Sequence, residues 1–126
     1  MTPDLPALIA DLEAATGPDR GFDARIAEAI GAGLPMVNGR TISEALAAFP
    51  RDGQGIARAF EVAPYTASID AALTLLPENI EARVARCPKH SSALVWVNVR
   101  RHLWGYAATP ALALCIASLR ARCGHE

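Results

Sequence analysis

A short segment near the end of the chain combines cations with aromatic rings. Within seven residues stand five side chains of these two kinds, namely Arg100, Arg101, His102, Trp104 and Tyr106. Arginine and aromatic residues bind single-stranded nucleic acid, because bases stack on the rings. The same residue types also dominate protein interfaces. A purely structural interpretation instead packs the two rings under the last helix and leaves the arginines in solvent. We take these five residues as a candidate interaction surface.

Cysteine and histidine residues occur in two short pairs that have the ligand types of a zinc site. Two residues separate Cys87 from His90, and one residue separates Cys123 from His125. Two thiolates with two imidazoles are a usual zinc ligand set. The second spacing is tighter than that of zinc fingers, and it lies at a terminus, where chains tend to fray. We therefore predict no metal site, and whether the four side chains approach each other stays open.

The potential nucleophiles stand in settings that favour structural roles. Cys115 lies in the most apolar stretch of the chain, which predicts a buried, unreactive thiol. Ser68 and Ser91 lack the strand–turn–helix context of a nucleophile elbow. Asp70 and Glu61 would make an acid–base pair if they met, but a carboxylate near a helix start already has a role with the helix dipole. We predict no catalytic residues.

Two glycine-containing segments are candidates for binding phosphate. Gly53-Gln54-Gly55 is not followed by the Gly-Lys-Ser/Thr of a nucleotide loop. Gly31-Ala32-Gly33 follows a predicted helix, whereas a nucleotide loop follows a strand. We therefore predict no bound cofactor.

The composition favours one folded domain in the cytoplasm. The 126 residues include 12 basic and 13 acidic side chains, for a net charge of −1, and 52% are hydrophobic. A nearly neutral chain has no overall field that attracts nucleic acid or an anionic membrane. Three widely spaced cysteines fit a reducing compartment. The N-terminus is not typical of a signal peptide, and no apolar stretch is long enough to cross a bilayer. We expect a single domain over residues 1–126 without a membrane partner.

Apolar residues at helical spacing predict four main helices. The last is apolar on nearly all sides between Ala111 and Leu119. A helix without a polar face is buried on several sides, so we expect it to be central to the domain. Thr66 is the expected N-cap of the third helix, with Ile69, Ala72, Leu73 and Leu76 as its buried stripe. The four predicted ranges are Asp4–Thr16, Phe22–Ile30, Thr66–Leu76 and Pro110–Arg122.

Two strands are predicted where apolar and polar residues alternate. They cover Ile80–Arg86 and Ala93–Arg100, and the turn Cys87–Ser91 joins them as an antiparallel hairpin. The alternation of the second strand places Val95 on one face and Leu94 and Trp96 on the other.

The segment 33–63 is poorly predicted and resembles an insertion. Thr41 with Glu44 is a capping box, which predicts a short helix that ends at Pro50. Arg51–Gly55 is expected to be a polar loop, and Arg58–Val62 fits either a short strand or a helical turn.

Parts of the chain resemble the phage ABA sandwich domain, a family of small phage and prophage proteins. The resemblance lies in Pro64–Pro77 and Ala107–Arg122, most strongly in the Thr-Pro-Ala-Leu-Ala-Leu-Cys-Ile-Ala run from Thr109, and again in Leu12–Asp19. It covers about half of the chain. Where the family commonly has Gly-Trp after a proline, this chain has Pro77-Glu78-Asn79-Ile80. The resemblance implies an α+β fold with helices on both faces of a small antiparallel sheet, an α/β/α sandwich. It implies no activity and no functional residues.

These observations favour a non-enzymatic accessory protein of a phage or prophage that binds another protein or a second copy of itself. The alternative is a nucleic-acid-binding protein that uses the segment Arg100–Tyr106. A second alternative is a small enzyme of unknown reaction.

Overall fold

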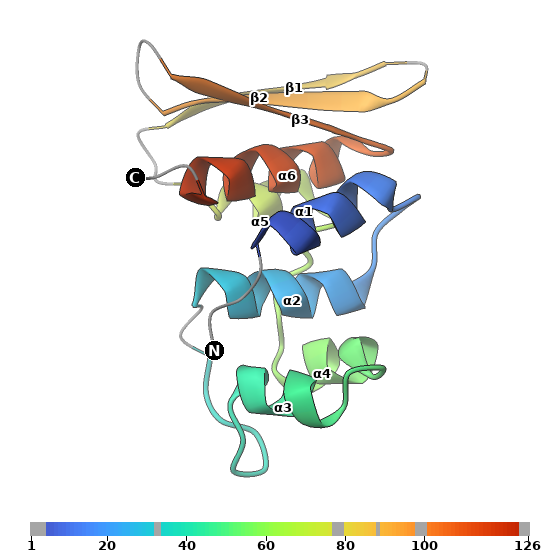
Figure 1. Cartoon of the computed structure of the whole chain (residues 1–126), viewed down its shortest axis with the longest axis vertical. Coiled ribbons are helices and arrows are strands. Elements are labelled where there is room, and N and C mark those ends of the chain that lie inside the picture. The colour runs from blue at the N-terminus through green and yellow to red at the C-terminus, as the bar shows by residue number, and fades with distance from the viewer. Residues whose placement is uncertain (1–4, 32–33, 77–79, 88, 98–100, 124–126) are drawn as a thin grey trace.

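The computed structural model describes residues 5–31, 34–76, 80–87, 89–97 and 101–123 (Figure 1). Within these residues it has six helices and one three-stranded antiparallel sheet, which confirms the α+β class. In chain order the elements are α1 (Leu5–Ala14), α2 (Arg20–Ile30), α3 (Ile42–Ala48), α4 (Gly53–Ala59), α5 (Ile69–Leu73), β1 (Glu81–Arg86), β2 (Ser91–Trp96), β3 (His102–Ala107) and α6 (Pro110–Cys123).

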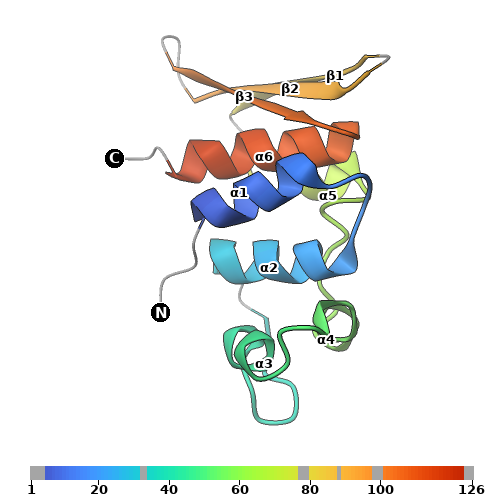
Figure 2. The ribbon, with the colours of Figure 1, turned by 45° about the vertical axis from the view of Figure 1, so that its right-hand side comes forward.

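The elements are stacked in layers, with the sheet at one end of the molecule (Figure 1). Beneath the sheet lie α6, α1 and α5, then α2, and finally α3 and α4 (Figures 1 and 2). Helices pack against the sheet as expected. The described helices all lie on one side of it, whereas the predicted sandwich placed helices on both faces. The other face of the sheet is therefore uncovered by the described part of the chain.

Helix α6 is the centre of the fold, as its apolar sequence predicts. Every residue from Ala111 to Leu119 is buried. The helix contacts the sheet on one side and α1 and α5 on the other. Thr109 caps its start, since the Thr109 hydroxyl accepts from the Leu112 backbone N–H at 3.2 Å. Among the described residues, no helix is long and apolar enough to cross a membrane.

The sheet has the strand order β1-β2-β3, and both pairs are antiparallel. The predicted hairpin of the first two strands is confirmed. The second strand ends earlier than predicted, at Trp96, and the predicted residues 98–100 lie outside the described part. The third strand, His102–Ala107, was not predicted. It contains most of the segment that the sequence marks as a candidate surface.

Helix α5 differs from the prediction for Thr66–Leu76. It covers only Ile69–Leu73, and the hydroxyl of Ser68, not of Thr66, caps it by accepting from the Ala71 N–H at 3.2 Å. Ile69 and Leu73, which we expected in the buried stripe, are 41% and 42% exposed. The buried positions are Ala72 and Leu75. Thr66 instead belongs to a buried polar cluster, in which it donates hydrogen bonds to Asp23.

The poorly predicted segment contains two short helices. The capping box is confirmed, because the Thr41 N–H donates to Glu44 at 2.9 Å and the Glu44 N–H donates to Thr41 at 3.2 Å. The predicted loop Arg51–Gly55 is wrong, since α4 begins at Gly53. A Cβ on Gly53 would lie 2.8 Å from the Cα of Gly21 in α2. Gly53 therefore allows α4 to pack closely against α2, and it does not lie in a loop.

Candidate interaction surface

The uncovered side of the sheet carries a continuous group of large side chains, which we call the outer sheet face. Successive strand residues point to opposite faces of a sheet. Gly105 and Ala107 are buried toward α6, so their neighbours on β3 point the other way. The strand register places Arg83 opposite Leu94 and Leu94 opposite Trp104. The outer sheet face consists of Glu81, Arg83, Leu94, Trp96, His102, Trp104 and Tyr106.

Aromatic rings form contacts across this face. Trp104 is 43% exposed and Tyr106 is 47% exposed, and their rings are stacked, with centroids 5.9 Å apart and planes at 9°. The ring of His90, in the turn between β1 and β2, lies 5.7 Å from that of Tyr106. The rings of Trp96 and His102 lie 6.5 Å apart. The result is an exposed aromatic surface that spans β2, β3 and one turn.

The arginine on the outer sheet face is already paired. The guanidinium of Arg83 lies 5.0 Å from the centroid of the Trp96 ring, a cation–π contact. Its Nε also donates to the Glu81 carboxylate at 3.1 Å. The outer sheet face therefore has little net charge.

The structure brings together three of the five predicted surface residues. His102, Trp104 and Tyr106 lie side by side on β3, and Arg100 lies outside the described residues. Arg101 is half-buried, and its backbone carbonyl accepts from the Val97 N–H at 2.9 Å. The structural interpretation of the two rings is wrong, since Trp104 and Tyr106 point away from α6 and do not pack beneath it.

The sequence analysis missed the contribution of β1 and β2 to this surface. Its strand alternation did place Leu94 and Trp96 on the face opposite Val95, and the structure confirms that separation, with Val95 buried toward α6. The prediction failed for this surface because it did not include the third strand. Once His102–Ala107 is paired with β2, its alternate aromatic residues join the same face as Trp96.

Of the four residues considered for zinc, the structure describes the side chains of Cys87 and His90. Cys87 and His90 are exposed at the hairpin turn, where the Cys87 N–H donates to the His90 carbonyl at 2.9 Å. The side chain of Cys123 and all of His125 lie outside the described residues. Within the part that the structure describes, no cluster of three or more metal-ligating residues occurs.

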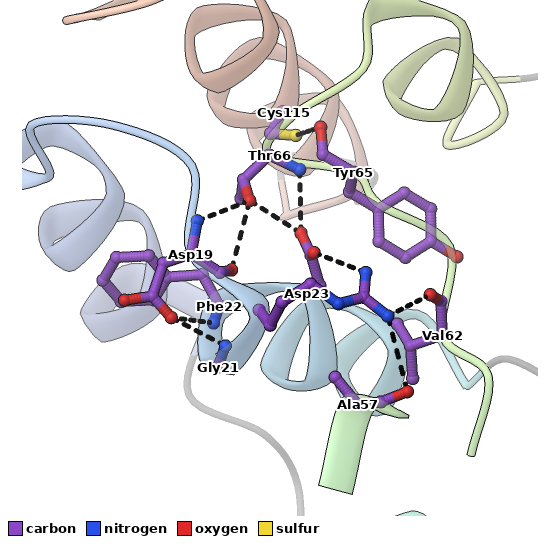
Figure 3. Close-up of polar contacts among 10 residues, drawn as sticks. Asp19, Gly21, Phe22, Asp23, Ala57, Val62, Tyr65, Thr66 and Cys115 are labelled. Atoms are coloured by element: carbon purple, nitrogen blue, oxygen red, sulfur yellow. Dashed lines mark hydrogen bonds and ion pairs between the residues drawn. The ribbon is translucent and has the colours of Figure 1, made fainter. Parts of the chain in front are cut away.

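A second group of polar residues lies in the interior, between the start of α2 and the segment 62–66 (Figure 3). One carboxylate oxygen of Asp23 accepts from both the N–H and the hydroxyl of Thr66, each at 2.8 Å. The other oxygen accepts from Nη1 of Arg20 at 2.8 Å. Arg20 also donates from Nη2 to the carbonyl of Val62 at 2.7 Å. Because Asp23 and Thr66 are 0% and 1% exposed, this cluster holds two segments together and is closed to a substrate.

Cys115 borders this cluster from α6 (Figure 3). Its thiol is fully buried and donates to the carbonyl of Tyr65 at 3.2 Å. Burial, and to a smaller extent the charge of Asp23, raises the thiol pKa to about 12. The thiol is therefore protonated at neutral pH and is a poor nucleophile. The expectation of a buried core cysteine is confirmed.

The other residues considered for catalysis lie apart from the outer sheet face. Ser68 caps α5, and Ser91 is buried on β2. Asp70 is exposed in the first turn of α5, where the charge of a carboxylate interacts favourably with the helix dipole. Glu61 is exposed directly after the last residues of α4, with a positive φ of 53°.

Comparisons with protein-family models, with curated proteins and with solved structures find no match to this chain. The resemblance to the phage ABA sandwich domain stays a prediction.

Proposed function

We propose that this protein is a non-enzymatic binding module whose outer sheet face docks against another protein. The observation that carries the proposal is the stacked, half-exposed pair Trp104 and Tyr106 on a sheet face that no described helix covers. Tryptophan and tyrosine supply much of the binding energy at protein interfaces. A contiguous apolar surface left in water marks an interaction site, because a partner that covers it gains the free energy of burial.

The charge of this face favours a protein over a phosphate backbone. Nucleic-acid binding depends on cations that neutralise phosphates. On the outer sheet face the described cation is Arg83, and Glu81 already pairs with it. Leu94 adds an aliphatic side chain at the middle of the sheet, opposite both Arg83 and Trp104. A surface that is aromatic, aliphatic and nearly neutral suits the apolar core of a protein interface.

The biological setting that we propose is an accessory role for a phage or prophage, in the cytoplasm. The sequence resemblance supports the first part of this setting, and the odd number of widely spaced cysteines supports the second. The partner is then either a host or phage protein or a second copy of this chain.

The test compares two double variants that remove the same kind of exposed side chain. Trp104→Ser with Tyr106→Ser removes the stacked pair. Ile69→Ser with Leu73→Ser is the matched control, since both residues are about equally exposed, at 41% and 42%, but lie on α5. Self-association is measured by sedimentation over a concentration series, and partner capture by pull-down from induced prophage-bearing cells.

We expect the Trp104/Tyr106 variant to weaken the association by more than about a hundredfold, because each hot-spot residue contributes about 2 kcal/mol or more. The Ile69/Leu73 control should bind normally. Equal binding by both variants, or a monomer that captures no protein, would overturn the proposal.

Single-stranded nucleic acid is the second candidate, and one observation favours it. At the turn between β1 and β2, the exposed Lys89 and His90 adjoin the outer sheet face, with the His90 ring in contact with Tyr106. A cation beside stackable rings is the arrangement of single-strand binding surfaces. A gel shift at low salt that weakens both in Lys89→Ala and in Tyr106→Ser would support this candidate. The absence of any shift would exclude it. The alternative of a small enzyme stays a prediction.

A further inference from the structure

A pocket of about 370 Å³ opens beside the second half of α6. Its volume lies within the range of small-molecule sites. Most of its lining is apolar, and two polar residues of α6 complete it. In the described chain the pocket shares no residue with the outer sheet face. The lining residues are Leu75, Leu76, Ile80, Val97, Ser118, Ala121 and Arg122.

Ser118 is the first sign that this pocket takes a ligand. Its side chain is completely buried, and its hydroxyl has no hydrogen-bond partner in the described part of the protein. Buried polar groups in native proteins nearly always have a partner, because an unpaired one loses its hydrogen bonds to water without replacement. Ser118 lines the pocket, but its hydroxyl is covered, so it reaches a ligand atom that accepts a hydrogen bond by rotation about the Cα–Cβ bond.

Arg122 supplies a cation at the same place. It follows Ser118 by four residues, so the two side chains are neighbours on one face of α6. Two of its nitrogens, Nε and Nη2, donate to the carbonyl of Leu75 at 3.3 and 3.1 Å, which fixes the guanidinium at the pocket.

The remaining nitrogen of Arg122, Nη1, has no partner among the described residues. Among the described residues Arg122 forms no ion pair with a carboxylate, unlike Arg120 of the same helix, which pairs with Glu13. A fixed guanidinium with a free donor is suited to an anion.

We propose that this pocket binds a small aliphatic carboxylic acid. The carboxylate accepts one hydrogen bond from the Ser118 hydroxyl and another from Nη1 of Arg122. The hydrocarbon chain lies against Leu75, Leu76 and Ile80, where its burial removes apolar surface from water. Charge and apolar lining together select this class, since an alcohol lacks the anion and an amine places a second cation beside Arg122.

Calorimetric titration of the full chain with octanoate tests the proposal. Octan-1-ol and octylamine, which have the same chain length, are the comparison ligands. We expect saturable binding of one octanoate, at least about tenfold weaker binding of octanol because the charge-assisted hydrogen bonds are lost, and no binding of octylamine. N-acetylleucine carries the same anion on a peptide-like body. Tighter binding of N-acetylleucine would assign the pocket to a peptide carboxyl terminus and overturn the aliphatic acid.

Three variants locate the binding at the pocket. Ser118→Ala and Arg122→Gln should each weaken octanoate binding about tenfold, the value of one hydrogen bond to a charged group. Arg120→Gln is the matched control on the same helix turn, because Arg120 donates to Glu13 and to the Trp104 carbonyl and does not line the pocket. It should bind octanoate normally.

Thermal unfolding separates this role from a structural one. Ser118→Ala should not lower the melting temperature without ligand, because it removes a hydroxyl that has no described partner. Failure of octanoate to bind, or equal binding by Ser118→Ala, Arg122→Gln and Arg120→Gln, would overturn the proposal. The result is independent of the outer sheet face, so Trp104→Ser with Tyr106→Ser should leave octanoate affinity unchanged.

Discussion

Asp23 places a carboxylate wholly inside the protein, with Thr66 on one oxygen and Arg20 on the other. Removing the charge of this carboxylate weakens the hydrogen bonds that Thr66 and Arg20 donate to it, whereas Arg20, with 33% of its side chain exposed, stays in contact with water. Arg20 keeps its contact with the Val62 carbonyl, but that dipole does not replace a carboxylate. The cluster also crosses between segments far apart in the chain, so its loss affects how α2 is fixed to the residues that precede α5.

We predict that Asp23→Asn lowers the free energy of unfolding by about 2 kcal/mol, the value of a hydrogen bond to a buried charged group. Asp11→Asn is the control, because Asp11 pairs with Arg25 at the surface and exposed pairs contribute less than about 1 kcal/mol. Urea unfolding of both variants measures the difference. Equal losses of unfolding free energy in the two variants would contradict the larger cost that we predict for the buried carboxylate of Asp23.

The thiol of Cys115 makes stability depend on pH in the alkaline range. Folding raises its pKa from the ordinary 9.0 to about 12. The unfolded chain therefore releases this proton above pH 9 while the folded protein keeps it. The stabilisation is complete below pH 9 and is lost as the pH rises toward 12, by about 1.4 kcal/mol per pH unit.

We predict that the free energy of unfolding falls more steeply between pH 9 and pH 10.5 in the wild type than in Cys115→Ala. Burial and, to smaller extents, the charges of Asp23 and Cys115 raise the pKa of Tyr65. The loss of Cys115 therefore reduces this second shift too, which flattens the slope of the variant in the same direction. Urea unfolding at several pH values measures the two slopes. Identical slopes would contradict the raised pKa of Cys115.

At the scale of elements, Gly105 controls how closely β3 approaches α6. A Cβ at this position would overlap the Ala113 carbonyl oxygen and lie 2.8 Å from the Ala117 nitrogen. Both are backbone atoms of a fully buried helix turn, so neither can rotate away. The strand and the helix must separate to admit even one methyl group.

Gly105→Ala should therefore destabilise the protein by about 2 kcal/mol, within the usual range for overpacking. Gly17→Ala is the control, because a Cβ there meets nothing within 4 Å. Thermal unfolding compares the two. A Gly105→Ala protein as stable as the Gly17→Ala protein would show that α6 and β3 separate at no cost.

Local signals predicted two helix starts correctly, each from a capping residue followed by apolar residues. The box of Thr41 and Glu44 and the start of α6 after Thr109 were both found this way. Prediction failed where tertiary contacts determine the role of a residue. Thr66 has the type of a helix cap but binds Asp23 in the core, and Gly53 has the type of a loop residue but allows α4 to approach α2. No local pattern carries that information.

At the scale of the whole molecule, the α+β class and the central last helix were predicted, and the arrangement of layers was not. The reason is β3. It contains Gly105, a residue type that is rare in strands, so its strand character depends on pairing with β2 and packing on α6. From the two predicted strands alone, it does not follow which face of the sheet the helices cover and which face they leave exposed. The outer sheet face therefore follows from the pairing of the three strands, whereas the sequence marked only its β3 residues as a candidate surface.

The central position of α6 has a consequence for how the protein is made. Helix α6 follows every other described element in the chain, so it leaves the ribosome after them. Yet the sheet, α1 and α5 all bury their apolar sides against it. Domains generally fold as units during or after synthesis. In this protein, the native packing of the sheet, α1 and α5 must wait until residue 119 has emerged, because these elements bury their apolar sides against α6.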